Sequence, residues 1–199
     1  MRPKNLEKES AIRTTALRII AEEGLENLTM QKLAKEARIS PRTIYLKYRD
    51  KDDLLVKLFI DEVLGAYETA VLENFSESMD LASGVQCVWL NAFRYFIRRK
   101  PAFVLMQYGK SSPLLNTAFQ ERDIREGQFF APIHRFLAIQ VSKGVILDLP
   151  FEVHRALLFA PLLDLINEYF EHAGRPQQII TEKLILDCSV ITIKGLLKH

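Results

Sequence analysis

The segment from Leu28 to Lys51 constrains the fold of this chain more than any other stretch. It predicts two short helices joined by a tight turn. Thr29 is a good N-cap for the first helix, and apolar residues follow it at helical spacing. Ser40 and Pro41 predict the start of the second helix, because serine caps well and proline at the first helical position loses no hydrogen bond. The pattern is typical of a helix-turn-helix whose second helix enters the DNA major groove.

The second helix of this pair is predicted over about residues 41 to 48, with Ile44 buried against the first helix. The same arrangement exposes several polar side chains, with no acid among them. They are Arg42, Thr43, Tyr45 and Lys47. Such side chains can donate hydrogen bonds to base edges or to phosphates. An ordinary helical hairpin with a solvated basic face is the alternative.

The composition predicts an all-α protein with a substantial core. Among 199 residues, glycine and proline number eight each, too few for a β-rich protein with many turns, and 48% of the residues are hydrophobic, which excludes disorder. The formal net charge is only +2, but residues 1–60 carry 13 Lys and Arg against 9 Asp and Glu, whereas residues 61–199 carry 14 against 16. The positive excess therefore lies with the helix-turn-helix, as binding to phosphates requires.

Residues 29–51 also resemble the DNA-binding domain of the TetR family of bacterial transcriptional regulators. The shared pattern has a threonine start, a Leu-Ala pair, an Ile-Ser turn, a Thr-Ile-Tyr triplet with an aromatic residue three positions later, and an Asp-Lys-Asp opening to the next helix. The chain departs from the family pattern at Arg38, where glycine is usual, and at Arg42, where glycine or alanine is common. A non-glycine residue in a left-handed turn costs about 1 kcal/mol, which the packing must offset.

The resemblance implies a homodimer that binds a near-palindromic operator in double-stranded DNA. Gln31, Arg42 and Thr43 are the candidates for contacts with base edges, and the other candidates would hold phosphates. Among the latter, Lys51 would add the positive end of a helix dipole, and Arg38 is peculiar to this chain. The residues expected to contact DNA are Thr29, Gln31, Arg38, Arg42, Thr43, Tyr45, Lys47 and Lys51.

The helices around this segment predict two domains. A first helix from about Leu6 to Glu23 completes a three-helix DNA-binding domain at residues 1–50. The helix that begins at Lys51 runs past Val71, so its second half must pack against later helices and would link the two parts mechanically. Residues 51–199 are expected to form a helical effector-binding and dimerisation domain.

The last two predicted helices, about residues 150–172 and 176–197, are apolar nearly all round. Such a helix must be covered on every side, and a second copy in a two-fold four-helix interface is the natural cover. One large monomeric core is the alternative. The residues expected at the interface are Leu158, Leu162, Leu165, Ile166, Tyr169, Leu184, Cys188 and Ile191.

The central helices are rich in aromatic residues that could enclose an apolar ligand cavity. The residues expected to line it are Trp89, Phe93, Phe96, Phe103, Met106, Gln107, Phe119, Phe130, His134, Phe159, Leu163 and Asn167. Its few polar members would orient the ligand. Plain core packing is the alternative for each residue, and the cavity itself is implied mainly by the family resemblance. The resemblance adds an unidentified small-molecule effector, expected to be largely apolar.

No catalytic motif is apparent. The two cysteines lie far apart without the spacing of a zinc site, the four histidines have no metal-ligand spacing, and no P-loop or nucleophile elbow is present. We therefore expect no enzyme, cofactor or metal. No apolar run approaches membrane-spanning length, so a cytoplasmic protein without a membrane partner is expected. Two alternatives to a ligand-responsive repressor are a ligand-independent DNA-binding regulator and a helical dimeric adaptor for other proteins.

Overall fold

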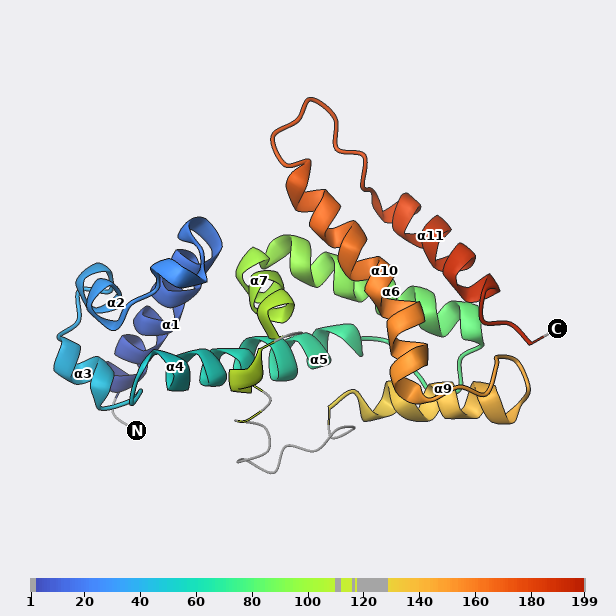
Figure 1. The fold of residues 1–199 in the computed structure, drawn as a ribbon, viewed down its shortest axis with the longest axis horizontal. Helices are drawn as coiled ribbons and strands as arrows, with labels where there is room; N and C mark the ends of the chain where they lie inside the picture. The colour runs from blue at the N-terminus through green and yellow to red at the C-terminus, as the bar shows by residue number, and fades with distance from the viewer. Residues whose placement is uncertain (1–2, 110–111, 116, 118–128, 199) are drawn as a thin grey trace. The chain divides into compact units, whose positions relative to one another are not determined.

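The computed structural model describes residues 3–109, 112–115, 117 and 129–198. The described residues are helical apart from loops and one isolated antiparallel bridge between Ile146 and Leu197, which confirms the predicted all-α class (Figure 1). The chain divides into two compact units. Unit 1 contains Met1–Gly65 and Arg99–Arg125, and unit 2 contains Ala66–Arg98 and Glu126–His199.

Unit 1 contains the predicted helix-turn-helix. Its elements are α1 (Pro3–Glu23), the 3-10 turn η1 (Leu25–Asn27), α2 (Met30–Glu36), α3 (Pro41–Tyr45), α4 (Lys51–Leu58), the π-helix η2 (Phe59–Gly65) and α7 (Lys100–Gly109). Both predicted caps are confirmed. The Thr29 side chain accepts a hydrogen bond from the Lys32 amide at 3.1 Å, and the Ser40 hydroxyl accepts one from the Thr43 amide at 3.3 Å. These local bonds place α3 just after the turn that follows α2.

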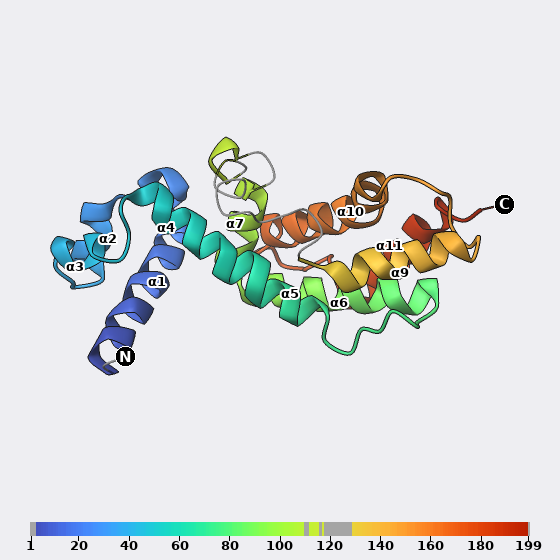
Figure 2. The ribbon, with the colours of Figure 1, turned by 90° about the horizontal axis from the view of Figure 1, so that it is seen from below.

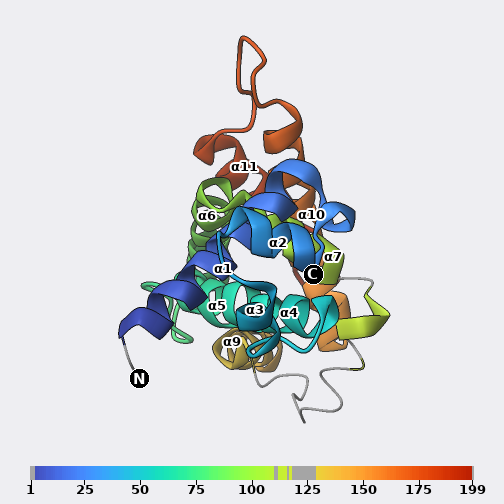
Figure 3. The ribbon, with the colours of Figure 1, turned by 90° about the vertical axis from the view of Figure 1, so that its left-hand side faces the viewer.

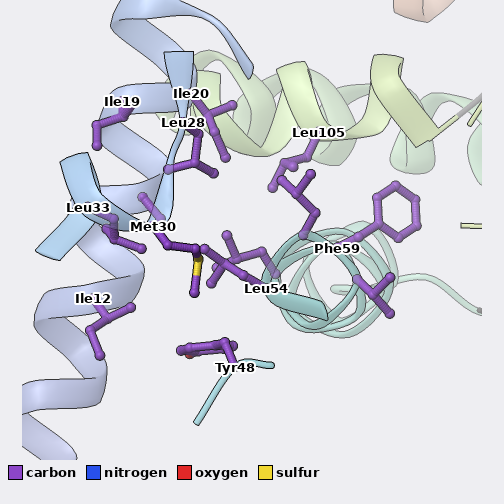
Figure 4. Packing of buried hydrophobic residues seen from close by; sticks show 14 of the residues in the cluster. Ile12, Ile19, Ile20, Leu28, Met30, Leu33, Tyr48, Leu54, Phe59 and Leu105 are labelled. Carbon is purple, nitrogen blue, oxygen red and sulfur yellow. The ribbon is translucent and has the colours of Figure 1, made fainter. Parts of the chain in front are cut away.

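One hydrophobic cluster holds unit 1 together, as Figure 4 shows. Ile12 and Ile19 of α1 pack with Leu33 of α2 and Leu54 of α4, and Leu105 of α7 joins the same cluster. The helix-turn-helix therefore shares its core with α4 and α7. The boundary at residue 50 between a DNA-binding and an effector-binding domain stays a prediction. By their packing, α4, η2 and α7 belong with the N-terminal helices.

The predicted long helix from Lys51 past Val71 is present as an unbroken helical run of α4, η2 and α5 (Ala66–Val71), but its middle is a π-helix. This wider segment carries two acids that bind α1. Arg13 donates hydrogen bonds to Asp61 and, at 2.7 Å, to Glu62. The pairing ties the first helix to the end of unit 1.

Unit 2 is organised around α6 (Leu81–Arg98), which packs against α5, α10 (Phe151–Glu171) and α11 (Glu182–Lys194); α9 (Ala131–Ser142) completes the unit (Figure 2). α11 begins later than the predicted residue 176, because Thr181 caps it by accepting a hydrogen bond from the Leu184 amide at 3.2 Å. Within the described ranges, no helix is both long and apolar enough to cross a membrane.

Candidate nucleic-acid interface

The outer face of α2 and α3 carries several of the predicted DNA-contacting side chains, and Figure 3 faces this pair of helices. Gln31 and Arg42 are exposed, and Tyr45 is 50% exposed although its neighbour Ile44 is fully buried. Thr43 is half-buried, with its hydroxyl 2.8 Å from the Ser40 hydroxyl. Ile44 thus anchors α3 in the core while the helix presents its polar residues outward.

Arg38 lies in the turn after α2 and has the left-handed backbone conformation expected at a position where the family usually has glycine. Its φ is 55°, in the left-handed region, and its side chain is exposed. The Ile39 amide donates to the Ala34 carbonyl at 3.0 Å, which closes α2 in the manner of a Schellman motif with Arg38 at the left-handed position. Ile39 packs against the core beside it and offsets part of the strain of about 1 kcal/mol.

Lys47 is the clearest correction to the expected set of outward side chains. Its ammonium forms an ion pair with Glu9 of α1, and its side chain is only 18% exposed. The sequence around α3 contains no acid, and the partner comes from 38 residues earlier in the chain. The expectation that Lys47 is exposed was wrong. Helical periodicity predicts on which side of its own helix a residue lies, but not which side chains of another helix contact it.

Lys51 opens α4 as predicted, but its ammonium also has a partner within the chain. It donates to the Leu25 carbonyl of η1 at 2.8 Å, which holds it beside the N-terminus of α4. Asp50 caps that helix. The Asp53 amide donates to the Asp50 carboxylate at 2.8 Å and, together with Arg49, holds the pKa of Asp50 below its ordinary value.

Leu46 is an exposed apolar residue that was not among the side chains expected to contact DNA. It follows directly on α3 and is 78% exposed, more than any other large hydrophobic residue that the structure describes. A signal for it was available, because residues two apart in a helix point to nearly opposite sides and Ile44 was expected to be buried. The outer side of α3 therefore combines Arg42, Tyr45 and an apolar side chain.

Three of the residues expected at a dimer interface lie instead in the core of the chain. Leu158, Leu162 and Ile166 are buried, and the Trp89 indole donates to the Leu158 carbonyl at 3.0 Å. Tyr169 packs edge-on against Phe93, and Leu165, Leu184 and Cys188 are half-buried. Of the expected set only Ile191 is largely exposed, at 69%. The sequence shows that both helices are apolar on all sides, but it does not show which side of each helix is buried by other helices of the same chain.

The large apolar residues that are exposed on these two helices share only Ile191 with the expected set. They are Val153 and Leu157 on α10, and Val190 and Ile191 on α11. Leu157 is one turn beyond Val153, so the two share a face of α10. We call these four residues the outer apolar face.

The residues expected to line a cavity are distributed over both units. Phe103, Met106 and Gln107 belong to unit 1, Phe119 lies outside the described residues, and the others belong to unit 2. Trp89, Phe93 and Phe96 are buried, and His134 stacks on Phe151 with ring centroids 3.4 Å apart. Phe159 and Leu163 are half-buried and Asn167 is exposed, and the expected role of Asn167 in orienting a ligand stays a prediction.

Two of the expected lining residues do meet at one aromatic cluster. The Tyr67 ring stacks on Phe96 at 4.5 Å between centroids and lies 5.5 Å from both Phe130 and Tyr95. Burial raises the pKa of the Tyr67 phenol above its ordinary value. The Phe130 amide donates to the Glu68 carboxylate at 2.6 Å and fixes the start of α9 beside α5. Among the described residues, no group of three or more potential metal ligands is assembled.

Comparison with known proteins gives the same picture. Residues 12–58 match the family described as bacterial regulatory proteins, tetR family. An uncharacterized HTH-type transcriptional regulator of Haemophilus influenzae is 36% identical over 93 residues, which are 46% of this chain and 49% of the relative. The fatty acid metabolism regulator protein of Bacillus subtilis is 34% identical over 76 residues, 38% of this chain and 37% of the relative. The chain thus matches half or less of the length of these curated relatives.

Similarity in three dimensions extends over the whole chain. The crystal structure of a TetR family transcription regulator from Marinobacter aquaeolei VT8 superposes with a TM-score of 0.83 and 23% identity, covering 100% of both chains. The general class is that of helical proteins with an exposed helix-turn-helix near the N-terminus. The matched residues then name the group within it: residues 12–58 match the tetR family of bacterial regulatory proteins, and the fold resembles that of a TetR family transcription regulator.

Proposed function

We propose that this chain is a ligand-responsive transcriptional repressor that binds a near-palindromic DNA operator as a homodimer in the cytoplasm. The observation that carries the proposal is the presentation of α3: its cap and Ile44 lock it in place, while Arg42 and Tyr45 face outward. A helix held in this way can enter a major groove without rearranging its own core. The mechanism requires no catalytic step and no cofactor.

The first experiment measures binding of the purified chain to the DNA upstream of its own gene by fluorescence anisotropy, at several salt concentrations. We expect one tight complex, and log K should fall linearly with log salt by roughly 0.9 for each phosphate neutralised. A duplex of unrelated sequence should bind far more weakly at the same salt. No binding to any duplex at low salt would instead favour the adaptor role.

Exposed Leu46 suggests an apolar contact with a thymine methyl group, which can be tested by removing single methyl groups from the operator. An apolar side chain on a reading helix recognises the methyl group of thymine. Replacing each operator thymine in turn by uracil removes only that methyl, and we expect one position per half-site at which wild-type affinity falls about threefold to tenfold. The Leu46→Ala variant should bind the thymine and uracil duplexes equally at that position. Equal sensitivity in both proteins would assign the methyl contact to another residue.

The homodimer is proposed to form through the outer apolar face of α10 and α11. Large apolar residues such as Leu157 and Ile191 are exposed there within the single chain. A two-fold axis would place each patch against its own copy, and paired reading helices would then match half-sites about 34–36 Å apart. A dimer of this kind would cover the exposed apolar surface and would require a near-palindromic operator.

An effector would act by binding two dimer conformations with different affinity. We propose a largely apolar molecule, and fatty acids are the first class to test because one relative is named a fatty acid metabolism regulator. The chain is titrated with fatty acids of increasing length while bound to its operator. Release of the DNA by one chain length would support the ligand-responsive form, whereas no change with any small molecule would favour the ligand-independent regulator.

A further inference from the structure

We propose that Glu9 is a built-in competitor of DNA for Lys47, so that the chain restrains its own affinity for the phosphate backbone. The inference rests on the proposed DNA-binding function and goes beyond it. In the unbound chain the Glu9 carboxylate takes the place that a DNA phosphate oxygen would occupy on the Lys47 ammonium. Binding to DNA through Lys47 then exchanges one anionic partner for another.

The geometry makes this pairing more than a passing surface contact. Glu9 lies on α1 and Lys47 lies just beyond α3, and the two side chains are 35% and 18% exposed. The two groups are thus partly shielded from solvent, which weakens screening by salt. The neighbouring Lys57 has partners of its own: its ammonium donates to the Lys47 carbonyl and to Asp53, both at 2.8 Å.

The exchange lowers the net gain from a phosphate contact in two ways. The ion pair with Glu9 must first be broken, which offsets part of the attraction between Lys47 and the phosphate. The released carboxylate then remains within a Debye length of the DNA backbone and is repelled by it. Both effects act on the sequence-independent part of binding, because phosphates carry no base information.

The test uses Glu9→Gln, which keeps the shape of the side chain and removes its charge. We expect this variant to bind operator and unrelated duplexes more tightly than the wild type, by about two- to fivefold, in keeping with the usual strength of such a pair. Affinity is measured by anisotropy at roughly 0.1 M salt, where the Debye length is about 10 Å. Thermal unfolding of each variant shows whether the fold is retained.

Glu7→Gln is the matched control. Glu7 is exposed on the same helix, and two residues' separation places it on nearly the opposite side from Glu9. The Glu7→Gln substitution makes the same change in net charge and leaves the ion pair between Glu9 and Lys47 intact. Lys47→Gln should weaken binding to all duplexes. In that background Glu9→Gln should bring a smaller gain than in the wild type, because only the repulsion between the Glu9 carboxylate and the DNA is left to remove.

The outcomes separate this inference from the function on which it rests. If the wild type binds no duplex, the proposed function itself fails. If the wild type binds but Glu9→Gln matches Glu7→Gln or weakens binding, the pair only positions α3 and the competition is overturned. A gain in the Lys47→Gln background as large as that in the wild type, or an unchanged affinity in Lys47→Gln alone, overturns it as well.

Discussion

The Ile191→Asp variant is expected to run as a monomer at concentrations where the wild type is a dimer. Ile191 is 69% exposed in the single chain, so an aspartate there leaves the core of unit 2 intact. In the dimer, symmetry would bury that carboxylate twice in an apolar interface, at a cost of several kcal/mol for each unpaired ion. The measurement is molar mass by light scattering after size exclusion, with circular dichroism as a check on folding.

Loss of the dimer should also reduce operator affinity by at least about a hundredfold, which corresponds to about 2.8 kcal/mol, because each half-site is then bound separately. Ile179→Asp is the control, since it makes the same chemical change at an isoleucine that is 50% exposed in the segment before α11. A dimeric Ile191→Asp variant, or a monomeric wild type, would remove the outer apolar face as the interface.

Arg42→Ala is expected to lose discrimination among operator sequences rather than general affinity for DNA. Its guanidinium is exposed on α3 and can donate two parallel hydrogen bonds to one guanine. The loss at one base pair should be about 1–3 kcal/mol, or roughly five- to 150-fold in affinity. The measurement compares wild type and variant on a set of operators, each with one base pair replaced.

Lys35→Ala supplies the control for charge, because Lys35 is also exposed and basic but lies at the end of α2. It should weaken binding to every duplex by a similar factor and leave the ranking of operators unchanged. If Arg42→Ala keeps the wild-type ranking, Arg42 contacts a phosphate, and the reading of bases falls to its neighbours on α3.

Local signals were the part of this protein that could be predicted well. Thr29 and Ser40 cap the helices where the sequence places them, because a cap depends on a hydrogen bond to an amide three residues away. Arg38 adopts the left-handed conformation that its position in the turn requires.

Predictions from the sequence were wrong where the burial or the partner of a side chain depends on a second helix. The sequence shows that α10 is apolar on all sides, but Trp89 and the rest of α6 decide that Leu158 turns inward and Leu157 outward. The π-helix at Phe59–Gly65 was not predicted from apolar spacing, and its two acids meet Arg13 from a distant helix. Periodicity specifies faces of a helix, and packing selects which face is covered.

The sequence by itself determined an all-helical chain with a capped helix-turn-helix, because those features rest on residues within one or two turns of each other. Only the tertiary structure decided that Glu9 neutralises Lys47, that α7 completes the core of unit 1, and that the outer apolar face is left uncovered. Each of these depends on side chains brought together from distant parts of the chain, where the free energy of burial and ion pairing, rather than local propensity, selects the arrangement.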